Sequence, residues 1–181
     1  PLAQIFHKER RFADLKKAKE LLEIIAKEQP QNGNVTRLKN NLNILSNANV
    51  GSRLPRFKTT DIAGNIITEG NFKGKTSIIF TWATWSYDSE NMKRRINSLI
   101  QQANGNYAAL GVNVDASRKT CEDAVKRDNI HFPNISDGML FDSKLMATLG
   151  LHAVPENIII DTKGKIIAKN VAIDDLEKYI K

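Results

Sequence analysis

The sequence predicts an α/β protein in which a mixed central β-sheet is flanked by helices and preceded by an N-terminal helical hairpin. Up to about residue 48, apolar residues recur at helical spacings of three and four. After a polar connector with Gly51 and Pro55, short apolar runs alternate with helical patterns, which favours β-α-β crossovers and parallel strand pairs. We therefore expect a helical appendage over residues 1–50 and an α/β domain over residues 51–181.

The first part of the chain is expected to form two helices. The turn between them contains Pro30 and Gly33, which interrupt helices. Two apolar stripes define the helices: Phe12, Leu15, Ala18, Leu22 and Ile25 in the first, and Val35, Leu38, Leu42 and Leu45 in the second. Their shared apolar face must pack on something. The hairpin is thus either a packing appendage or an arm that binds a partner, and a homodimer through these helices stays open.

The α/β part is expected to begin with a β-hairpin over residues 62–67, with Gly64 and Asn65 at its turn. Apolar runs and turn signals then place the elements in this order: a strand at 77–82, a helix at 90–102, a strand at 107–115, a helix at 119–127, a short helix at 144–149, a strand at 156–160, a strand at 165–169 and a helix at 174–181.

Composition excludes some classes of function. The formal net charge is +7, but Lys and Arg are spread along the chain without a nucleic-acid-binding signature, so we expect no nucleic acid partner. No apolar run approaches the roughly 20 residues of a membrane-spanning helix, so no transmembrane segment is expected in this chain. The chain begins at Pro1 and includes no signal segment. One cysteine and three scattered histidines form no ligand set, so neither metal nor cofactor is expected.

Several motifs after residue 51 resemble those of one family. They are Phe72-Lys73-Gly74-Lys75, Phe80-Thr81-Trp82-Ala83-Thr84-Trp85, Val112-Asn113-Val114-Asp115, Phe132-Pro133, and Val154-Pro155 ahead of 158–161. These stretches resemble the thioredoxin-like domain of membrane-anchored, extracytoplasmic thiol–disulfide oxidoreductases, within the thioredoxin/peroxiredoxin superfamily. The resemblance covers about 130 residues and leaves the helical hairpin out. It implies a thioredoxin-like fold and an extracytoplasmic (periplasmic or envelope-associated) location.

The family's chemistry requires Cys-x-x-Cys at the start of the helix that follows the first core strand. There the helix N-terminus favours the thiolate of the first cysteine, which attacks a disulfide that the second cysteine resolves. By the resemblance, Ser86 and Ser89 occupy these two positions. A hydroxyl neither ionises near pH 7 nor forms a disulfide, so dithiol exchange is excluded at these positions. The sequence leaves open whether the serines are natural or engineered.

The resemblance also implies a binding groove. The family's proline after a cis peptide bond faces the active-site turn, and the residue before it offers backbone groups to an extended substrate. Here these residues are Pro155 and Val154, so we expect a cis bond beside Trp85 and Ser86. The expected binding residues are Trp82, Trp85, Tyr87, Asp88, Val154 and Pro155.

Two functions therefore remain open. The first is a redox-inactive binding or adaptor module, not an enzyme, that holds a protein or peptide in the groove between Trp85–Ser89 and Pro155. The second is a family member with residual redox activity through its one cysteine, Cys121. Cys121 follows Lys119 early in a helix, which favours the thiolate, but neighbouring acidic residues oppose this effect. A Ser-His-Asp hydrolase is not expected, because Ser86 is not in a G-x-S-x-G elbow.

Overall fold

The computed structural model describes residues 17, 18, 20–36, 38, 39, 48–103 and 105–180. Contacts divide the chain into two compact units, residues 1–47 and 48–181. In the first unit, the described residues are helical at 17, 18 and 20–28, and again at 33–36, 38 and 39. Residues 1–16, 19, 37 and 40–47 of the predicted hairpin, among them Phe12, Leu15, Leu42 and Leu45, lie outside the described residues.

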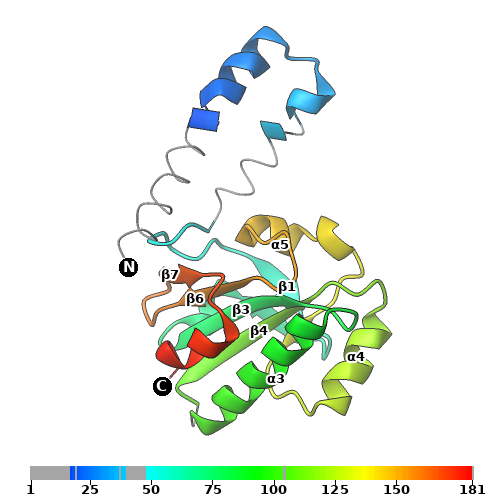
Figure 1. Ribbon diagram of the computed structural model, residues 1–181, viewed down its shortest axis with the longest axis vertical. Coiled ribbons are helices and arrows are strands. Elements are labelled where there is room, and N and C mark those ends of the chain that lie inside the picture. Colours follow the sequence, from blue (N-terminus) through cyan, green and yellow to red (C-terminus); the bar gives the residue numbers. More distant parts are fainter. Residues whose placement is uncertain (1–16, 19, 37, 40–47, 104, 181) are drawn as a thin grey trace. The chain divides into compact units, whose positions relative to one another are not determined.

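The second unit is built on a mixed five-stranded sheet with the strand order β5-β4-β3-β6-β7. Parallel pairing joins β3 to β4 and β4 to β5, whereas β6 is antiparallel to both β3 and β7 (Figure 1). The strands are β3 (Thr76–Trp82), β4 (Tyr107–Asn113), β5 (Asn134–Ile135), β6 (Asn157–Ile160) and β7 (Ile166–Lys169). The predicted mixed sheet is confirmed, although the short strand β5 was not expected.

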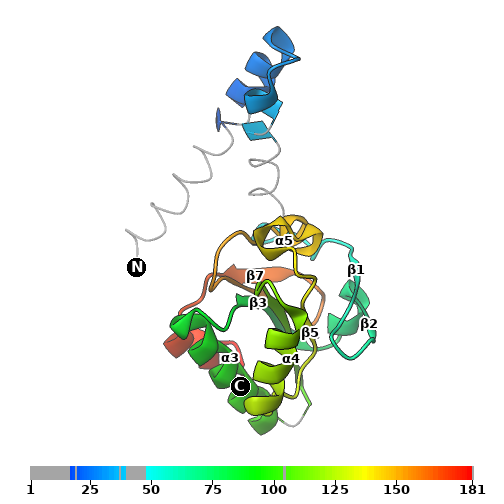
Figure 2. The ribbon, with the colours of Figure 1, turned by 90° about the vertical axis from the view of Figure 1, so that its right-hand side faces the viewer.

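Helices cover both faces of this sheet (Figure 2). Because successive strand residues point to opposite faces, β3 sends Ile78, Phe80 and Trp82 toward α3 and α4, and Ile79 toward α5. The helices are α3 (Tyr87–Gln102), α4 (Arg118–Arg127), α5 (Lys144–Leu149) and the 3₁₀ turns η1 (Glu69–Phe72), η2 (Leu140–Asp142) and η3 (Ile173–Lys178). The predicted C-terminal α-helix is thus a 3₁₀ segment. Among the described residues, no helix combines the length and apolarity needed to cross a bilayer.

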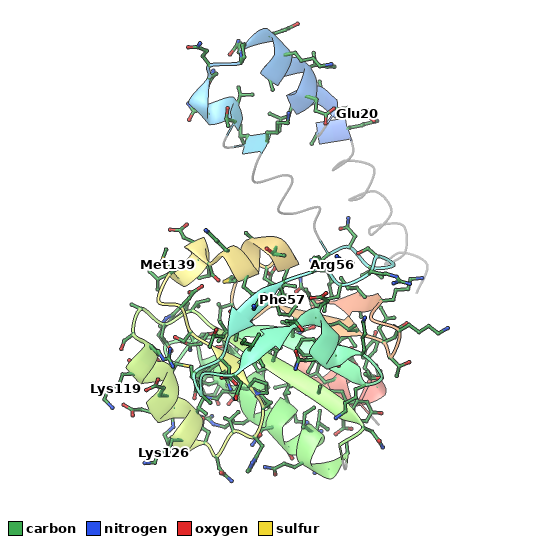
Figure 3. The ribbon with its side chains drawn as sticks, turned by 180° about the vertical axis from the view of Figure 1, so that it is seen from behind. Glu20, Arg56, Phe57, Lys119, Lys126 and Met139 are labelled. Atoms are coloured by element: carbon green, nitrogen blue, oxygen red, sulfur yellow. The ribbon has the colours of Figure 1, made fainter. Side chains whose placement is uncertain are left out.

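A separate hairpin of β1 (Lys58–Thr60) and β2 (Ile66–Thr68) precedes the sheet. The predicted strand at Ile62 is wrong, because this residue lies in the turn. The Asp61 carboxylate accepts the N–H groups of residues 63 and 65 and so closes this turn. Phe57, labelled in Figure 3, anchors the start of the hairpin, with its ring centroid 6.2 Å from that of Phe72.

Candidate functional site

The candidate site lies at the end of the sheet at which strand β3 ends and strand β6 begins. The N–H of Thr81 donates to the C=O of Glu156 at 2.9 Å in the antiparallel β3–β6 pair. Since the two strands run in opposite directions, the turn after β3 (residues 83–86) and the loop before β6 (residues 152–156) leave the sheet at the same edge. The fold therefore brings together two segments that are about 70 residues apart in the sequence.

The loop before β6 is held by Thr81 and Glu156. The Thr81 hydroxyl donates to the C=O of Ala153 at 2.7 Å and accepts the N–H of Glu156 at 2.8 Å. The buried Glu156 carboxylate accepts the N–H groups of His152 at 2.7 Å and Ala153 at 3.2 Å. Hydrogen bonds to a carboxylate are about twice as strong as those between neutral groups, so this loop is firmly positioned.

Val154 lies at the centre of this loop, and its peptide bond to Pro155 is cis. The Val154 side chain packs against the apolar cluster that lies on the α5 face of the sheet. Its backbone N–H and C=O make no hydrogen bond to any of the residues that the structure describes. One donor and one acceptor therefore remain available at a rigid position.

Ser86 and Ser89 both serve the start of α3. Ser86 is the N-cap residue, and its hydroxyl accepts the N–H of Ser89 at 3.4 Å. The Ser89 hydroxyl is fully buried, accepts the N–H of Ala83 at 3.0 Å, and lies 2.9 Å from the C=O of Ser86 and 3.1 Å from that of Ala83. Both serines thus satisfy backbone groups at a helix terminus, as capping residues do.

The aromatic residues of this segment divide into a surface pair and a buried ring. Trp85 and Tyr87 are 62% and 78% exposed, and Asp88 is exposed beside them in the first turn of α3. Trp82, in contrast, is fully buried, and its indole N–H donates to Asn134 Oδ1 at 2.9 Å. Trp85 and Tyr87 are therefore available to a partner, whereas the prediction of Trp82 as a binding residue is wrong, because this ring is completely buried in the sheet.

A buried cluster of charged residues lies against Trp82. Lys93 of α3 is fully buried, with its ammonium 4.0 Å from the centroid of the Trp82 ring. The same ammonium pairs with Glu90 at 2.6 Å and with Asp128 at 2.9 Å. The sequence showed the Glu90–Lys93 spacing of three, but this spacing is typical of exposed helix pairs, so the burial was missed. The cluster fixes α3 on the sheet close to the helix start.

Asp115 connects the end of β4 to the turn after β3. Its buried carboxylate accepts both the N–H and the hydroxyl of Thr84, at 3.1 Å and 2.9 Å, and the side-chain amide of Asn113 at 2.7 Å. The sequence marked Asp115 only as part of a family motif. Asp115 contacts Thr84 because the parallel pairing of β3 with β4 places the ends of these two strands side by side.

Cys121 is the single cysteine of the chain, and it is fully buried on the α4 side of the sheet. Burial, with a further contribution from the Asp115 carboxylate, raises the pKa of the Cys121 thiol to about 12. Only the thiolate is nucleophilic, so both the burial and the raised pKa disfavour reaction of this thiol near neutral pH. Within the described part of the chain, no cluster of His, Cys, Asp and Glu has the arrangement of a metal site.

The sheet order, the helix at the end of β3 and the cis-proline loop define a thioredoxin-like domain. The model of the AhpC/TSA family matches residues 50–169, so the chain belongs to this family. Thiol-disulfide oxidoreductase ResA of Bacillus thuringiensis subsp. konkukian is 27% identical over 140 residues, which are 73% of this chain and 77% of that protein. Thiol:disulfide interchange protein DsbE of Vibrio cholerae is 27% identical over 125 residues, or 67% of this chain and 65% of that protein.

Solved structures agree with this assignment. The C-terminal domain of a Bacteroides thetaiotaomicron protein named as a thiol-disulfide oxidoreductase superimposes with a TM-score of 0.65 at 26% identity, over 72% of this chain and 93% of that one. A secreted thiol-disulfide isomerase from Corynebacterium glutamicum shares the fold, with a TM-score of 0.61 at 20% identity, over 70% of this chain and 82% of that one. The predicted fold class and the relation to thiol-disulfide oxidoreductases are thereby confirmed.

Proposed function

We propose that this protein is a redox-inactive thioredoxin-like module that binds an extended protein or peptide segment in the groove between Trp85–Ser89 and Pro155. One observation carries the proposal. The backbone N–H and C=O of Val154 have no hydrogen-bond partner among the described residues, and Ser86 and Ser89 stand at the start of α3 in place of the family's two cysteines. These backbone groups support binding at this position, and the sequence has no cysteine in the turn that could act on a bound disulfide.

Binding would use the backbone and the exposed aromatic rings together. An extended segment beside Val154 would gain two main-chain hydrogen bonds from the loop before β6. Trp85 and Tyr87 offer large rigid surfaces to its side chains, at the low conformational cost that makes aromatic residues frequent in interfaces. Asp88 adds an exposed negative charge, which favours a basic residue in the bound segment.

The alternative function, a residual redox activity through Cys121, meets an obstacle. The thiol is buried, and a pKa near 12 leaves almost no thiolate at pH 7. Native protein should therefore react with 5,5′-dithiobis(2-nitrobenzoic acid) only as fast as it unfolds. Reduction of insulin disulfides by the chain at a rate that is lost in Cys121→Ala would defeat the proposed redox inactivity. Fast labelling of native Cys121 would support the alternative.

We also propose an extracytoplasmic location. The motifs resemble an extracytoplasmic oxidoreductase type, and one protein with the same fold is a secreted isomerase. Fractionation of cells that produce the full native protein tests this proposal, with a cytoplasmic and an exported marker enzyme as references. Recovery with the cytoplasmic marker would contradict it.

The binding proposal is tested with a defined unfolded peptide, the S-carboxymethylated insulin B chain. Titration into ¹⁵N-labelled protein should shift the Val154 amide and the Trp85 indole resonances, and the double variant Trp85→Ala/Tyr87→Ala should weaken binding at least about tenfold. Ile66→Ala is the matched control, because Ile66 is 59% exposed on β2 and belongs to neither of the two segments that form the proposed groove. Equal binding by the wild type and the double variant, or shifts confined to residues outside the groove, would refute the proposal.

A further inference from the structure

The first helical segment of the chain carries a stripe of side chains that are exposed in the described part of its unit. Lys17, Leu21, Ile24 and Glu28 follow one another at spacings of four, three and four, which places them on one face of a helix. Leu21 and Ile24 are 59% and 56% exposed, whereas Leu22, on another face, is partly buried. The helix therefore has a packed face and a separate apolar face that is open.

The two ends of this stripe carry opposite charges. Lys17 and Glu28 are exposed, and neither has an ion-pair partner among the residues that the structure describes. Glu28 lies in the last turn of the helix, where a carboxylate meets the negative end of the helix dipole and destabilises an isolated helix slightly. At 1.5 Å per residue the stripe is about 16 Å long. It is an apolar centre between a positive and a negative end.

We propose that this stripe binds the same stripe of a second copy of the chain, with the two helices antiparallel. A two-fold axis between Leu21 and Ile24 then packs each Leu21 on Ile24 of the other copy. The same axis places each Lys17 beside Glu28 of the other copy, so every contact occurs twice. Parallel pairing would instead set lysine against lysine and glutamate against glutamate, which is unfavourable. The charge pattern thus selects both the partner and the orientation.

The proposed pairing is independent of the groove near Pro155 and goes beyond the proposed binding function. A dimer presents two grooves in one particle, so a partner with two binding segments gains avidity without any new contact. The described helical stretch is short, and interfaces below about 1,200 Å² are weak. We therefore expect a dimer that dissociates upon dilution.

Sedimentation equilibrium of the full chain tests the pairing, in buffer of low ionic strength and at protein concentrations up to about 1 mM. Lys17→Glu and Glu28→Lys should each raise the dimer dissociation constant about tenfold, because a single reversal creates two like-charge contacts in every dimer. The combined variant Lys17→Glu/Glu28→Lys restores both pairs and should return the constant to within about threefold of wild type. Lys126→Glu is the control, because Lys126 is exposed on α4 and forms no ion pair with any residue that the structure describes.

The apolar contact is tested separately. Leu21→Ala/Ile24→Ala keeps strong helix formers in the segment and should abolish dimers, with the helical circular dichroism signal preserved. A wild-type chain that stays monomeric throughout the concentration range would overturn the proposal. So would a combined charge variant that is no better than the single reversals, since this would place the contact elsewhere. Dimers that persist unchanged in the alanine variant would also overturn it.

Discussion

Replacing Lys93 by methionine should destabilise the protein strongly. The fully buried ammonium pairs with Glu90 at 2.6 Å and Asp128 at 2.9 Å and lies 4.0 Å from the centroid of the Trp82 ring. Removing one member of a buried ion pair usually costs about 3–5 kcal/mol, because the remaining charge stays buried without its partner. Arg94 and Arg127 still pair with both carboxylates, so we expect the low end, about 3 kcal/mol. Methionine fills a similar volume, which keeps a cavity from adding to this loss.

Urea unfolding measures the effect. With a dependence on urea of about 2 kcal/mol per molar, the midpoint should fall by about 1.5 M. Lys119→Met is the matched control, because Lys119 pairs with Asp123 at 3.2 Å on the exposed surface of α4, and we expect a change of about 0.5 kcal/mol or less. A loss below about 1 kcal/mol in Lys93→Met would refute the reasoning, since it would mean that the ion pairs only balance the cost of burying their charges.

Three further changes test other contacts. Gly111→Ala should lower the free energy of unfolding by about 2–4 kcal/mol in thermal denaturation, because the new Cβ would collide with Asn134 Oδ1 and break its hydrogen bond to Trp82; a neutral result would mean that this bond can shift. Hydrogen bonds and nearby positive charge lower the pKa of Asp128, so its contribution to stability is full above its unfolded value of about 3.9 and is lost as pH falls toward the lowered pKa. In urea titrations between about pH 2 and 6, Asp128→Asn should therefore flatten the fall in stability, and an unchanged slope would contradict this. Thr81→Val removes the hydroxyl that holds the cis-proline loop, so calorimetry should show weaker binding of the carboxymethylated insulin B chain and urea unfolding a loss of about 1–3 kcal/mol; unchanged affinity would show that Thr81 does not position the loop.

Most of the second unit was predictable because its elements have clear periodicities. The strands at 77–82 and 156–160 and the helices at 119–127 and 144–149 were placed within about one residue of β3, β6, α4 and α5. The strand β5 was missed because it has two residues, too few for a pattern. The start of the hairpin was misplaced because Ile62 resembles a strand residue, while the Asp61 carboxylate holds it in a turn.

The candidate site was only partly predictable. Sequence motifs located Ser86, Trp85 and Pro155 because these residues belong to local signals: a helix cap, an aromatic run and an X-Pro bond. Glu156 and Lys93 were missed as structural residues, because the role of each depends on partners that only the folded sheet brings close. Charged residues are usually exposed, so no local pattern indicates that one of them is buried.

The burial of Cys121 bears on how a bound polypeptide would dissociate. It is the only cysteine of the given sequence and is buried, so we expect that the folded chain does not form a mixed disulfide with a cysteine-bearing polypeptide. A complex at the groove would form and dissociate without any reductant, and its lifetime would depend on the dissociation rate alone. A changing redox poise in the compartment would leave that lifetime unaltered, which distinguishes such a protein from thiol-bearing members of the same fold.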